Sequence, residues 1–561
     1  MTHLITRACC NDAACVAVCP VNCIHPTPDE PAYRTAELLF IDPGTCIDCG
    51  ACVEVCPVDA IKRDTELTTE DHGFLALNAR FFDDFDYPRP GFVESAAERA
   101  RGTLTETLRL AVVGSGPAAV YAVEAAIQAT DGNVDVHVFE RLSTPWGLVR
   151  FGVAPDHQDT KNIVHGMERI LSAPQVTLHL NVEIGTHLHH DELRKHFHAI
   201  IYATGAPDDR RLAIGGEELP GSISAADFVA WYNGHPDAAH HRFDLSGPRA
   251  VIFGNGNVAL DAARILVSDP ETLGARSDIA AHALAELNSS GIREVVVIGR
   301  RGPEQAAFTT PELLALSNTP GIDVVVAPYG IDVVVAPYGI DGVAEQSYSA
   351  KAQLIARLPR RGESGDSRRV ILRFLASPLR ILGETKVTGV ELMRNELTAG
   401  GDGRLVASPS GESETLDCGL VLRAVGYRGR DIAGVPFDEK RGAFREADGR
   451  LLDGTGNVVT GAYTAGWAKR GPSGVIGTNR SCAGETVASV VDDFARGLLG
   501  NPEQDPDEIG ELLRRRHPET LDMVAWRRID TYEQDQGRAA RRPRIKLVDA
   551  GELLAVGRGT R

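Results

Sequence analysis

Four cysteines near the N-terminus have the spacing of an iron–sulfur loop. They stand in Cys46-Ile-Asp-Cys49-Gly-Ala-Cys52-Val-Glu-Val-Cys56-Pro57, a C-x2-C-x2-C-x3-C-P pattern. Three closely spaced thiolates can hold one cluster, while the fourth, next to the proline, reaches a second cluster. A zinc site more often has two separated C-x2-C pairs, and a structural disulfide does not need this spacing. We therefore expect residues 46–57 to bind iron–sulfur clusters.

An incomplete copy of the same pattern precedes this loop. Counting back from Cys19-Pro20 with the same spacing gives Cys15, then Asp12, then Cys9, so a carboxylate stands at the second ligand position. The flanking residues repeat as well, because 19–24 (Cys-Pro-Val-Asn-Cys-Ile) matches 56–61 (Cys-Pro-Val-Asp-Ala-Ile). Such a duplication predicts a pseudo-twofold module in which each half lends one cysteine to the cluster of the other half.

The duplicated module resembles a bacterial two-cluster ferredoxin of the seven-iron kind, over residues 1–62. Its crossed pattern gives a 4Fe–4S cluster to Cys19, Cys46, Cys49 and Cys52. The other cluster would take Cys9, Cys15 and Cys56. The missing thiolate favours 3Fe–4S there, although the Asp12 carboxylate could hold a labile fourth iron. Cys10 is the alternative to Cys9, but only Cys9 keeps the register.

Length and composition bound the rest of the chain. At 561 residues we expect about three or four domains, and 43% hydrophobic with 24% charged residues is ordinary for a globular protein. Nine of the eleven cysteines lie within residues 9–56, which indicates a cofactor cluster in a reducing compartment. No run of about 18 apolar residues and no secretory leader is evident. The net charge of −19 argues against nucleic-acid binding, and we expect a cytoplasmic protein.

A first dinucleotide-binding unit begins at residue 108. The apolar run 108–113 leads to Gly114, Gly116 and Ala119, and a second run, 134–139, ends in Glu140. Gly114 permits the tight turn, Gly116 lets the backbone approach a pyrophosphate, and Ala119 allows close packing of the following helix on the strand. Glu140 stands where an acid binds ribose hydroxyls. Together these features predict a Rossmann fold.

A second unit of this kind follows the run 249–253. Its glycine turn and helix start are Gly254, Asn255, Gly256, Asn257 and Val258. Each such unit binds one pyrophosphate, so two units predict two dinucleotides. The later run 294–298 ends in Gly-Arg-Arg rather than in an acid, and we expect Arg300 and Arg301 to bind the 2′-phosphate of NADP.

Two further blocks, 144–157 (Thr-Pro-Trp-Gly-Leu-Val-Arg-Phe-Gly-Val-Ala-Pro-Asp-His) and 466–480, resemble NADPH–ferredoxin reductases of the adrenodoxin-reductase type. The resemblance spans 108 to about 495 and implies FAD in the first unit and NADP(H) in the second. It implies a role in the reaction for His157, Glu312 and Trp467, with Ala315 where a further acid would be expected. The flavin contacts that it implies are Leu148, Thr204, Gly205, Trp467, Gly474, Val475 and Ile476.

The expected fold class is α/β, with two Rossmann-like domains preceded by a small α+β ferredoxin domain. We expect a ferredoxin domain over 1–62, a tail and linker over 63–107, FAD-binding parts over 108–215 and 421–500, an NADP-binding domain over 216–420, and a helical tail over 501–561. Residues 421–427 are expected to return to the first fold. The tail carries ten basic and six acidic residues over 510–546 and is expected to be a solvated helical segment rather than a docking surface for the ferredoxin. The segment 321–329 is repeated at once at 330–338, which we interpret as a duplication accommodated at the surface.

These expectations combine into an NADPH:ferredoxin oxidoreductase fused to its own ferredoxin. A flavin exchanges a hydride with NADPH and single electrons with clusters, so it belongs between them. The electrons would pass to the fused ferredoxin, to a separate ferredoxin, or to another one-electron acceptor such as a cytochrome P450. The alternatives are an electron-input flavoprotein of a larger redox complex, as in glutamate synthase, and a sensor that binds nucleotides without turning over.

Overall fold

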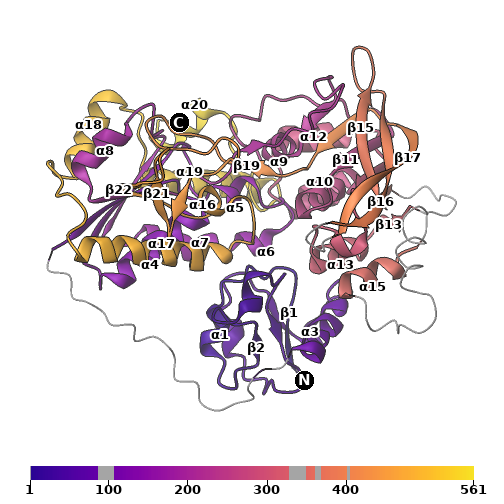
Figure 1. Ribbon diagram of the computed structural model, residues 1–561, viewed down its shortest axis with the longest axis horizontal. Coiled ribbons are helices and arrows are strands. Elements are labelled where there is room, and N and C mark those ends of the chain that lie inside the picture. The colour runs from indigo at the N-terminus through magenta and orange to yellow at the C-terminus, as the bar shows by residue number, and fades with distance from the viewer. Residues whose placement is uncertain are drawn as a thin grey trace.

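The computed structural model describes residues 2–85, 87, 106–327, 349–359, 368–400 and 405–560. A small N-terminal domain lies beneath two larger domains, each of which is built on a mostly parallel sheet (Figure 1). The expected α/β class, with two dinucleotide-binding domains and a small α+β domain in front, is confirmed. Within the described residues, no helix has the length and apolar character that crossing a membrane requires.

The N-terminal domain has the expected pseudo-twofold architecture. β1 (His3–Ile5) pairs with β4 (Ile61–Arg63), and β2 (Ile24–His25) pairs with β3 (Phe40–Ile41), both antiparallel. The helices α1 (Ala14–Val18) and α2 (Ala51–Val55) each follow one cysteine loop. Equivalent positions of the two halves share left-handed backbone: Asn11 and Asp48 (φ 57° and 55°), Ala13 and Gly50 (60° and 78°), and Asn22 and Asp59 (50° and 49°).

Helix α3 (His72–Asp84) extends this domain beyond residue 62. The buried Asn78 side chain joins it to both sheets, because its Nδ2 donates to the Ile5 carbonyl at 2.8 Å and its Oδ1 accepts from the amides of Ile5 and Ile41 at 3.1 and 3.0 Å. The first part of the expected tail therefore folds onto the ferredoxin domain. Most of the expected linker, 88–105, lies outside the described residues.

The first large domain, which the sequence predicts to bind FAD and which is called the FAD domain below, contains a seven-stranded sheet covered on both faces. Alternate residues of its central strand enter different cores. Leu110 and Val112 pack with α4 (Pro117–Ala129) and α17 (Thr478–Ala495), whereas Ala111 and Val113 pack with α8 (His190–His196) and α18 (Glu508–Arg516). The strand order is β20 (Glu446–Ala447), β21 (Arg450–Leu452), β22 (Val458–Thr464), β8 (Ala199–Tyr202), β5 (Leu108–Val113), β6 (Val134–Glu140) and β7 (Val176–Leu180), parallel from β22 to β7. The helices of this domain are α4 (Pro117–Ala129), α5 (Leu148–Phe151), α6 (Gln158–Lys161), α7 (Val164–Leu171), α8 (His190–His196), α16 (Trp467–Arg470) and α17 (Thr478–Ala495).

The second large domain, the NADP domain, has a six-stranded parallel sheet. Its strand order is β10 (Ser222–Ser224), β18 (Leu420–Arg423), β11 (Arg249–Phe253), β12 (Glu294–Ile298), β14 (Arg368–Arg373) and β13 (Ile322–Val326). Its helices are α9 (Ala225–Tyr232), α10 (Asn257–Val267), α11 (Pro270–Arg276), α12 (Ala281–Asn288), α13 (Thr310–Ser317) and α15 (Ala350–Arg357). A three-stranded antiparallel sheet, β15 (Ala376–Leu382), β16 (Gly389–Ala399) and β17 (Leu405–Asp417), projects from this domain.

One sequence expectation changes at this sheet. The run beginning at 421 does not return to the FAD domain, because β18 pairs with both β10 and β11 in the NADP sheet. Its continuous apolar run suits a buried parallel strand in either sheet, so the sequence pattern does not tell to which sheet the strand belongs. The first copy of the duplicated segment supplies β13, and the second copy lies outside the described residues.

The C-terminal segment folds into α18 (Glu508–Arg516), α19 (Met523–Ala539) and α20 (Ala550–Gly557). The expectation of a solvated tail is wrong, because α19 buries Trp526 and Glu533 against the FAD domain. Arg150 Nη2 lies 2.6 Å from Glu533 Oε1 in a buried ion pair. The many charges of α19 hid this buried face, since its partners come from a distant part of the chain.

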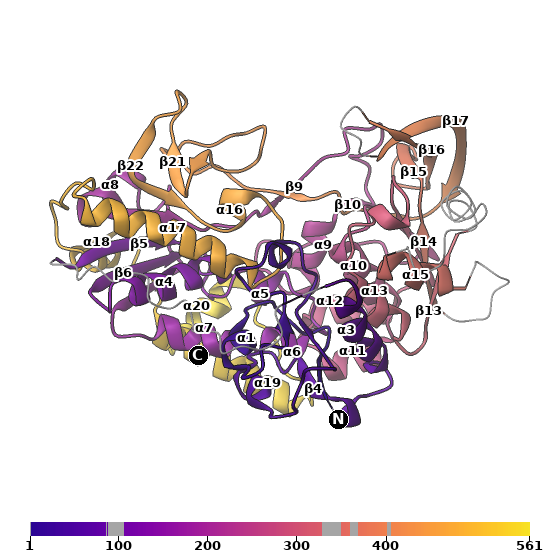
Figure 2. The ribbon, with the colours of Figure 1, turned by 60° about the horizontal axis from the view of Figure 1, so that its bottom comes forward.

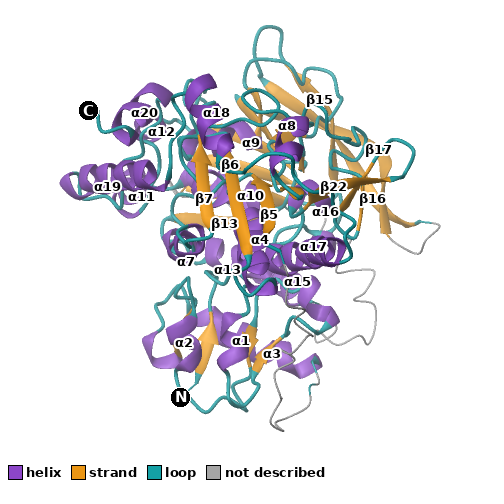
Figure 3. Cartoon of the chain, turned by 90° about the vertical axis from the view of Figure 1, so that its left-hand side faces the viewer, coloured by secondary structure: helices purple, strands orange, loops and turns teal. Residues whose placement is uncertain are grey.

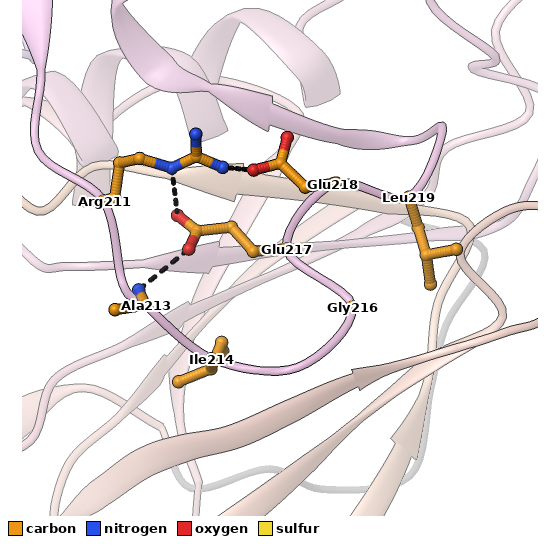
Figure 4. Close-up of a pocket in the computed structure, with 7 residues that line it drawn as sticks. All are labelled: Arg211, Ala213, Ile214, Gly216, Glu217, Glu218 and Leu219. Atoms are coloured by element: carbon orange, nitrogen blue, oxygen red, sulfur yellow. Dashed lines mark hydrogen bonds and ion pairs between the residues drawn. The ribbon is translucent and has the colours of Figure 1, made fainter.

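The chain passes from the FAD domain to the NADP domain through 208–219. β9 (Asp208–Asp209) pairs with β19 (Tyr427–Arg428), so both passages between the domains run side by side. In the pocket formed by 211–219, the buried Glu217 accepts from the amides of Leu212 and Ala213 at 2.8 Å, and Arg211 pairs with Glu218 (Figure 4). These charged groups are neutralised by one another, and we assign no ligand to this pocket.

Candidate functional site

The first cluster site gathers three cysteines and one carboxylate. Burial raises the pKa of Cys9 to about 12, and the nearby charges of Cys56 and Asp12 add to the shift. Burial likewise raises the pKa of Cys15, which is repelled by Cys9, Asp12 and Cys56. Four acidic groups that repel one another in a buried site are a donor set that cationic iron would neutralise. Cys9, Cys15 and Cys56 therefore fit a cluster, with Asp12 beside them.

The second cluster site is a pocket lined by four predicted ligands together. Its walls include Cys19, Cys46, Cys49 and Cys52, contributed by both halves of the domain. Burial raises the pKa of Cys52 to about 11, with repulsion from Cys46, Cys19 and Cys49 in addition. Cys23 lines the same pocket, but the four cysteines at ligand spacing fit a 4Fe–4S cluster, and Cys19 reaches it across the pseudo-twofold as the spacing predicts.

Cys10 and Cys23 also lie beside these sites. Cys23 Sγ is 3.4 Å from Cys19 Sγ, and this hydrogen bond lowers the pKa of Cys19 to about 6. Cys10 is buried, and its carbonyl accepts a hydrogen bond from the FAD domain. The choice of Cys9 over Cys10 as a ligand stays a prediction. All eleven cysteines lie in the described part of the chain, and none forms a disulfide.

The two glycine turns have the same construction. Gly114 has φ 105° and donates its amide to Phe139 O at 2.8 Å, while Gly254 has φ 108° and donates to Ile298 O at 3.0 Å. A Cβ at Gly114 would overlap the carbonyl oxygen of Ala203, and a Cβ at Gly254 would overlap that of Ala424; each carbonyl follows the end of the adjacent strand. Only glycine fits this approach, which leaves the backbone of each turn open to a pyrophosphate at a helix N-terminus.

Gly116 and Gly256 are the residues from which α4 and α10 begin. Ala119 is fully buried at the helix–strand contact, and Val258 packs at the edge of the NADP-domain core. The side-chain oxygen of Asn257 accepts from Thr309 N at 2.8 Å, and that of Asn255 accepts from Ala307 N at 3.4 Å. The second glycine turn thereby holds the segment that leads to Glu312.

The flavin-side residues converge on the first glycine turn. Glu140 ends β6 and accepts hydrogen bonds from Ser115, at 3.1 Å from its amide and 2.7 Å from its hydroxyl. Gly147 packs its backbone against Gly116, and Leu148 begins the next helix, α5. Thr204 and Gly205 follow β8, the strand adjacent to β5, and Gly205 has φ 72° with open space at its missing side chain.

The closing loop, 466–477, leads into α17. Trp467 begins α16, and its Nε1 donates to Ser473 O at 3.1 Å. Gly474 has φ 78°, and Val475 donates its amide to Thr478 Oγ1 at 3.1 Å. Ile476 is buried. This ordered loop of glycine and apolar residues fits a contact with a flat aromatic ring such as that of a flavin.

His157 and Glu312 come together between the two large domains. Their ligand atoms and that of Asp261 lie within 4.8 Å of one another. Arg264 Nη2 is 2.8 Å from His157 Nε2, and the same guanidinium pairs with Asp156 at 2.7 and 2.9 Å. Although three such groups could hold a metal, the adjacent arginine already supplies their positive charge. Glu312 Oε2 is buried without a hydrogen-bond partner, so it is open to a ligand at this position.

Arg300 and Arg301 follow β12 at the carboxyl edge of the NADP sheet. Their side chains are exposed, while their backbone carbonyls are fixed by Asn395 Nδ2 at 2.9 Å and Leu375 N at 3.2 Å. This leaves two guanidinium groups on an anchored turn, a suitable arrangement for a phosphate.

The ferredoxin domain contacts both large domains (Figures 2 and 3). On the FAD side, Gly477 N donates to Cys10 O at 2.6 Å, and Arg480 Nη1 donates to Asp12 O at 3.3 Å. On the NADP side, Glu37 accepts from Thr310 N at 2.7 Å and pairs with Lys351 at 3.2 Å. The loop that carries Cys9 and Asp12 therefore lies directly against the closing loop of the expected flavin site.

Sequence reasoning missed Arg7, Asp156, Asp261 and Arg264 around His157. A signal for two of them exists, because Asp261 and Arg264 are the polar residues in the interior of an otherwise apolar helix, α10, and stand three positions apart. An apolar helix that retains an acid and a base at that spacing indicates a buried ion pair. Arg7 and Asp156 carry no comparable signal.

Known proteins share this architecture over the whole chain. Residues 39–62 match the 4Fe-4S binding domain family. A probable ferredoxin/ferredoxin–NADP reductase of Mycobacterium leprae is 44% identical over 565 residues, covering 100% of this chain and 98% of that protein. The corresponding protein of Mycobacterium tuberculosis strain H37Rv is 46% identical over 572 residues, covering 99% and 95%.

A solved structure matches the larger part. Mycobacterium tuberculosis FprA in complex with NADPH is 43% identical, with a TM-score of 0.75, and covers 81% of this chain and 100% of that chain. The cysteine loops, the two glycine turns and the full-length identity agree. The chain belongs to the ferredoxin/ferredoxin–NADP reductase family.

Proposed function

We propose that this protein takes electrons from NADPH and delivers them to iron–sulfur clusters of its own ferredoxin domain, or to a separate ferredoxin. FAD supplies the chemistry that joins the two ends, because a flavin accepts a hydride and releases single electrons. The residues that would hold FAD are those of the first glycine turn, Glu140, the 204–205 turn and the closing loop. Those of the second glycine turn, with Arg300 and Arg301, would hold NADPH.

The contact between the first cluster loop and the closing loop carries this proposal. Gly477 N–H donates to Cys10 O, one residue after Ile476 and next to Cys9. A Cβ at Gly477 would overlap the Asn11 backbone, so the two loops are in direct backbone contact. This contact supports an intramolecular outlet from the flavin site, and it argues against a protein whose sites bind nucleotides without turnover.

The protein's own groups have defined tasks in this reaction. His157, Asp261 and Glu312 surround a position between the two dinucleotide domains, where reactants can be oriented and water excluded. Trp467, held by its hydrogen bond to Ser473, would close the flavin side of the site. No covalent nucleophile is required, because hydride transfer needs only that the reacting rings be positioned.

The finer assignments form part of the proposal. Asp12 takes the place of a fourth thiolate at the first cluster, which favours 3Fe–4S as isolated, with 4Fe–4S through Asp12 as the alternative. Arg300 and Arg301 select NADPH over NADH. The final acceptor is a ferredoxin or another one-electron carrier such as a cytochrome P450, and the protein works in the cytoplasm.

An anaerobic titration with NADPH, followed by optical and EPR spectra, tests the function. We expect flavin bleaching, then reduction of clusters, with about one equivalent of NADPH needed for each electron pair taken up. NADPH-dependent reduction of ferricyanide and of cytochrome c should both occur. Clusters that stay oxidised while the flavin is reduced would contradict the intramolecular outlet. Tight association with a large partner during purification would instead indicate an electron-input subunit.

A further inference from the structure

Arg7 of the ferredoxin domain reaches into the reductase and contacts His157. Its Nη1 lies 2.8 Å from His157 Nε2, the same nitrogen that Arg264 Nη2 approaches at 2.8 Å. An arginine only donates hydrogen bonds, so His157 Nε2 must accept, and its proton therefore resides on Nδ1. The ferredoxin domain thus adds a second donor to the nitrogen that Arg264 already requires to be the acceptor.

The surroundings keep this imidazole neutral. His157 is buried, and burial lowers the pKa of His157 well below its usual range, with the charges of Arg7 and Arg264 lowering it further against the opposing effect of Asp156. Other charged groups that face it are Asp261, at 3.7 Å, Glu312 and Lys161. A neutral, accepting imidazole is the form that two guanidinium groups can share.

The position of Arg7 is set by the cluster loop. The next residue, Ala8, accepts from Thr160 Oγ1 at 3.5 Å, and Cys10 accepts from Gly477. Residues 7–12 therefore run along the reductase, from His157 to Arg480, in a single extended contact. Only one residue separates Arg7 from Cys9, so the backbone position from which Arg7 reaches His157 is set together with that of the cluster loop.

We propose that Arg7 is a positioning residue that the ferredoxin domain contributes to the reductase site, where it holds His157 as a hydrogen-bond acceptor and links docking of the ferredoxin to the geometry of the nicotinamide position. The inference rests on the proposed function, because it assigns a role at that reaction site. It adds a residue from outside the reductase part of the chain. In the undocked state, His157 keeps Arg264 but loses one of its two donors.

Substitution of Arg7 tests this role. In Arg7→Met, we expect flavin reduction by NADPH in single turnover to slow about tenfold, the factor that corresponds to one hydrogen bond to a charged group. The pKa of His157 should rise toward its usual value, because one of the cations that lower it is gone. The pH dependence of NADP⁺ binding, measured by calorimetry, should shift to higher pH. Arg7→Lys keeps a cation that donates and should restore most of both properties.

Arg34→Met is the matched control. Arg34 lies on the same domain and faces Glu485 at 3.6 Å with a largely exposed side chain, so it should leave both measurements unchanged. Unaltered flavin reduction and an unaltered binding profile in Arg7→Met would overturn the proposal. If NADPH failed to reduce the flavin of the wild-type protein, the proposed function would be rejected. The calorimetric comparison of the variants would still report on Arg7. Circular dichroism shows whether Arg7→Met folds. If it does not fold, the same two measurements on Arg7→Lys and Arg7→Gln test the role of Arg7.

Discussion

Asp12 is the residue on which the type of the first cluster depends. It is largely buried, and burial raises the pKa of its carboxyl, against the attraction of Arg480. Arg480 in turn pairs with Glu124 at 2.9 Å, so Asp12 lies at the end of a network that continues into the FAD domain. The carboxylate is therefore held by the domain interface and is not a free loop acid.

Replacing Asp12 with cysteine would complete the C-x2-C-x2-C pattern. We expect Asp12→Cys to convert a 3Fe–4S cluster into 4Fe–4S, because the fourth iron gains a thiolate ligand. EPR of the oxidised protein should show a 3Fe signal in the wild type and lose it in the variant. Glu54→Cys, which adds an exposed thiol outside the register, should retain the signal. A wild type without a 3Fe signal would favour the Asp12-ligated 4Fe alternative.

Arg300 and Arg301 determine the expected nucleotide preference. Removing either one deletes a charge-assisted hydrogen bond to the 2′-phosphate, so kcat/KM for NADPH should fall about tenfold in Arg300→Ala or Arg301→Ala. NADH lacks that phosphate and serves as the internal control, with kcat/KM unchanged. Steady-state reduction of ferricyanide measures both. A wild type that uses NADH as well as NADPH would remove the basis for this assignment.

The closing loop and the first cluster loop form the element on which the proposed electron delivery depends. Gly477 has an ordinary φ, so its requirement for glycine comes from space and not from backbone strain. In α17, which starts one residue later, Gly484 has open space around its missing side chain. Replacing each of these two glycines with alanine therefore distinguishes an effect on docking of the ferredoxin domain from an effect on the stability of the helix.

Gly477→Ala should push the two loops apart. Overpacking of this kind costs about 1–3 kcal/mol, which predicts a weakening of docking of roughly 5- to 150-fold. Cytochrome c reduction through the clusters should fall, whereas ferricyanide reduction directly from the flavin should persist. Gly484→Ala should change neither rate. Equal loss of both activities in Gly477→Ala would mean that the substitution damages the flavin site itself.

Helix α19 is held to the FAD domain by a buried ion pair. Glu533 is fully buried and receives Arg150, Arg544 at 3.1 Å, and the amide of Leu547 at 2.8 Å. Glu533→Gln leaves Arg150 without its charge partner, and breaking such a pair costs about 3–5 kcal/mol. The thermal unfolding midpoint should drop clearly, whereas Asp535→Asn on the exposed side of α19 should have little effect. An unchanged midpoint in Glu533→Gln would show that α19 docks independently of this pair.

Local sequence patterns predicted those sites whose residues lie close together in the sequence. The cysteine loops and the glycine turns lie where the sequence places them, because ligands and turn residues a few positions apart are brought together by one loop. The cluster around His157 could be foreseen only in part. Glu312 was expected at the reaction site, and the spacing of Asp261 and Arg264 in an apolar helix indicates a buried ion pair. The contact of Arg7 with His157 could not be foreseen, because only the docking of the ferredoxin domain creates it. For the same reason, the β18 pairing and the burial of α19 departed from expectation.

At the scale of the whole molecule, buried carboxylates couple folding to pH. Burial alone raises the pKa of Glu533, but Arg150 and Arg544 more than offset it and leave the pKa lowered. The pKa of Asp278 is lowered in the same way, because the attraction of Lys161 and Lys546 outweighs the effect of burial. A group whose folded pKa is depressed contributes stability above its unfolded pKa and loses that contribution as pH falls through the folded pKa.

Acidification should therefore loosen the packing of the C-terminal segment. The unfolded pKa of a carboxyl is about 4, so we expect stability to be retained near neutral pH and to decline progressively below about pH 4. Thermal unfolding followed across this range measures the effect, and Glu533→Gln should show a shallower decline because one contributing group is absent. A midpoint that does not fall on acidification would contradict this account.

The contacts of the ferredoxin domain span the junction between the two dinucleotide domains. Gly477 and Arg480 fasten it to one of them, and Thr310 and Lys351 fasten it to the other through Glu37. Any rotation of one large domain against the other must shear one of these two sets of bonds. The N-terminal domain is thus a bridge that resists relative rotation of the two large domains, in addition to carrying the cluster sites.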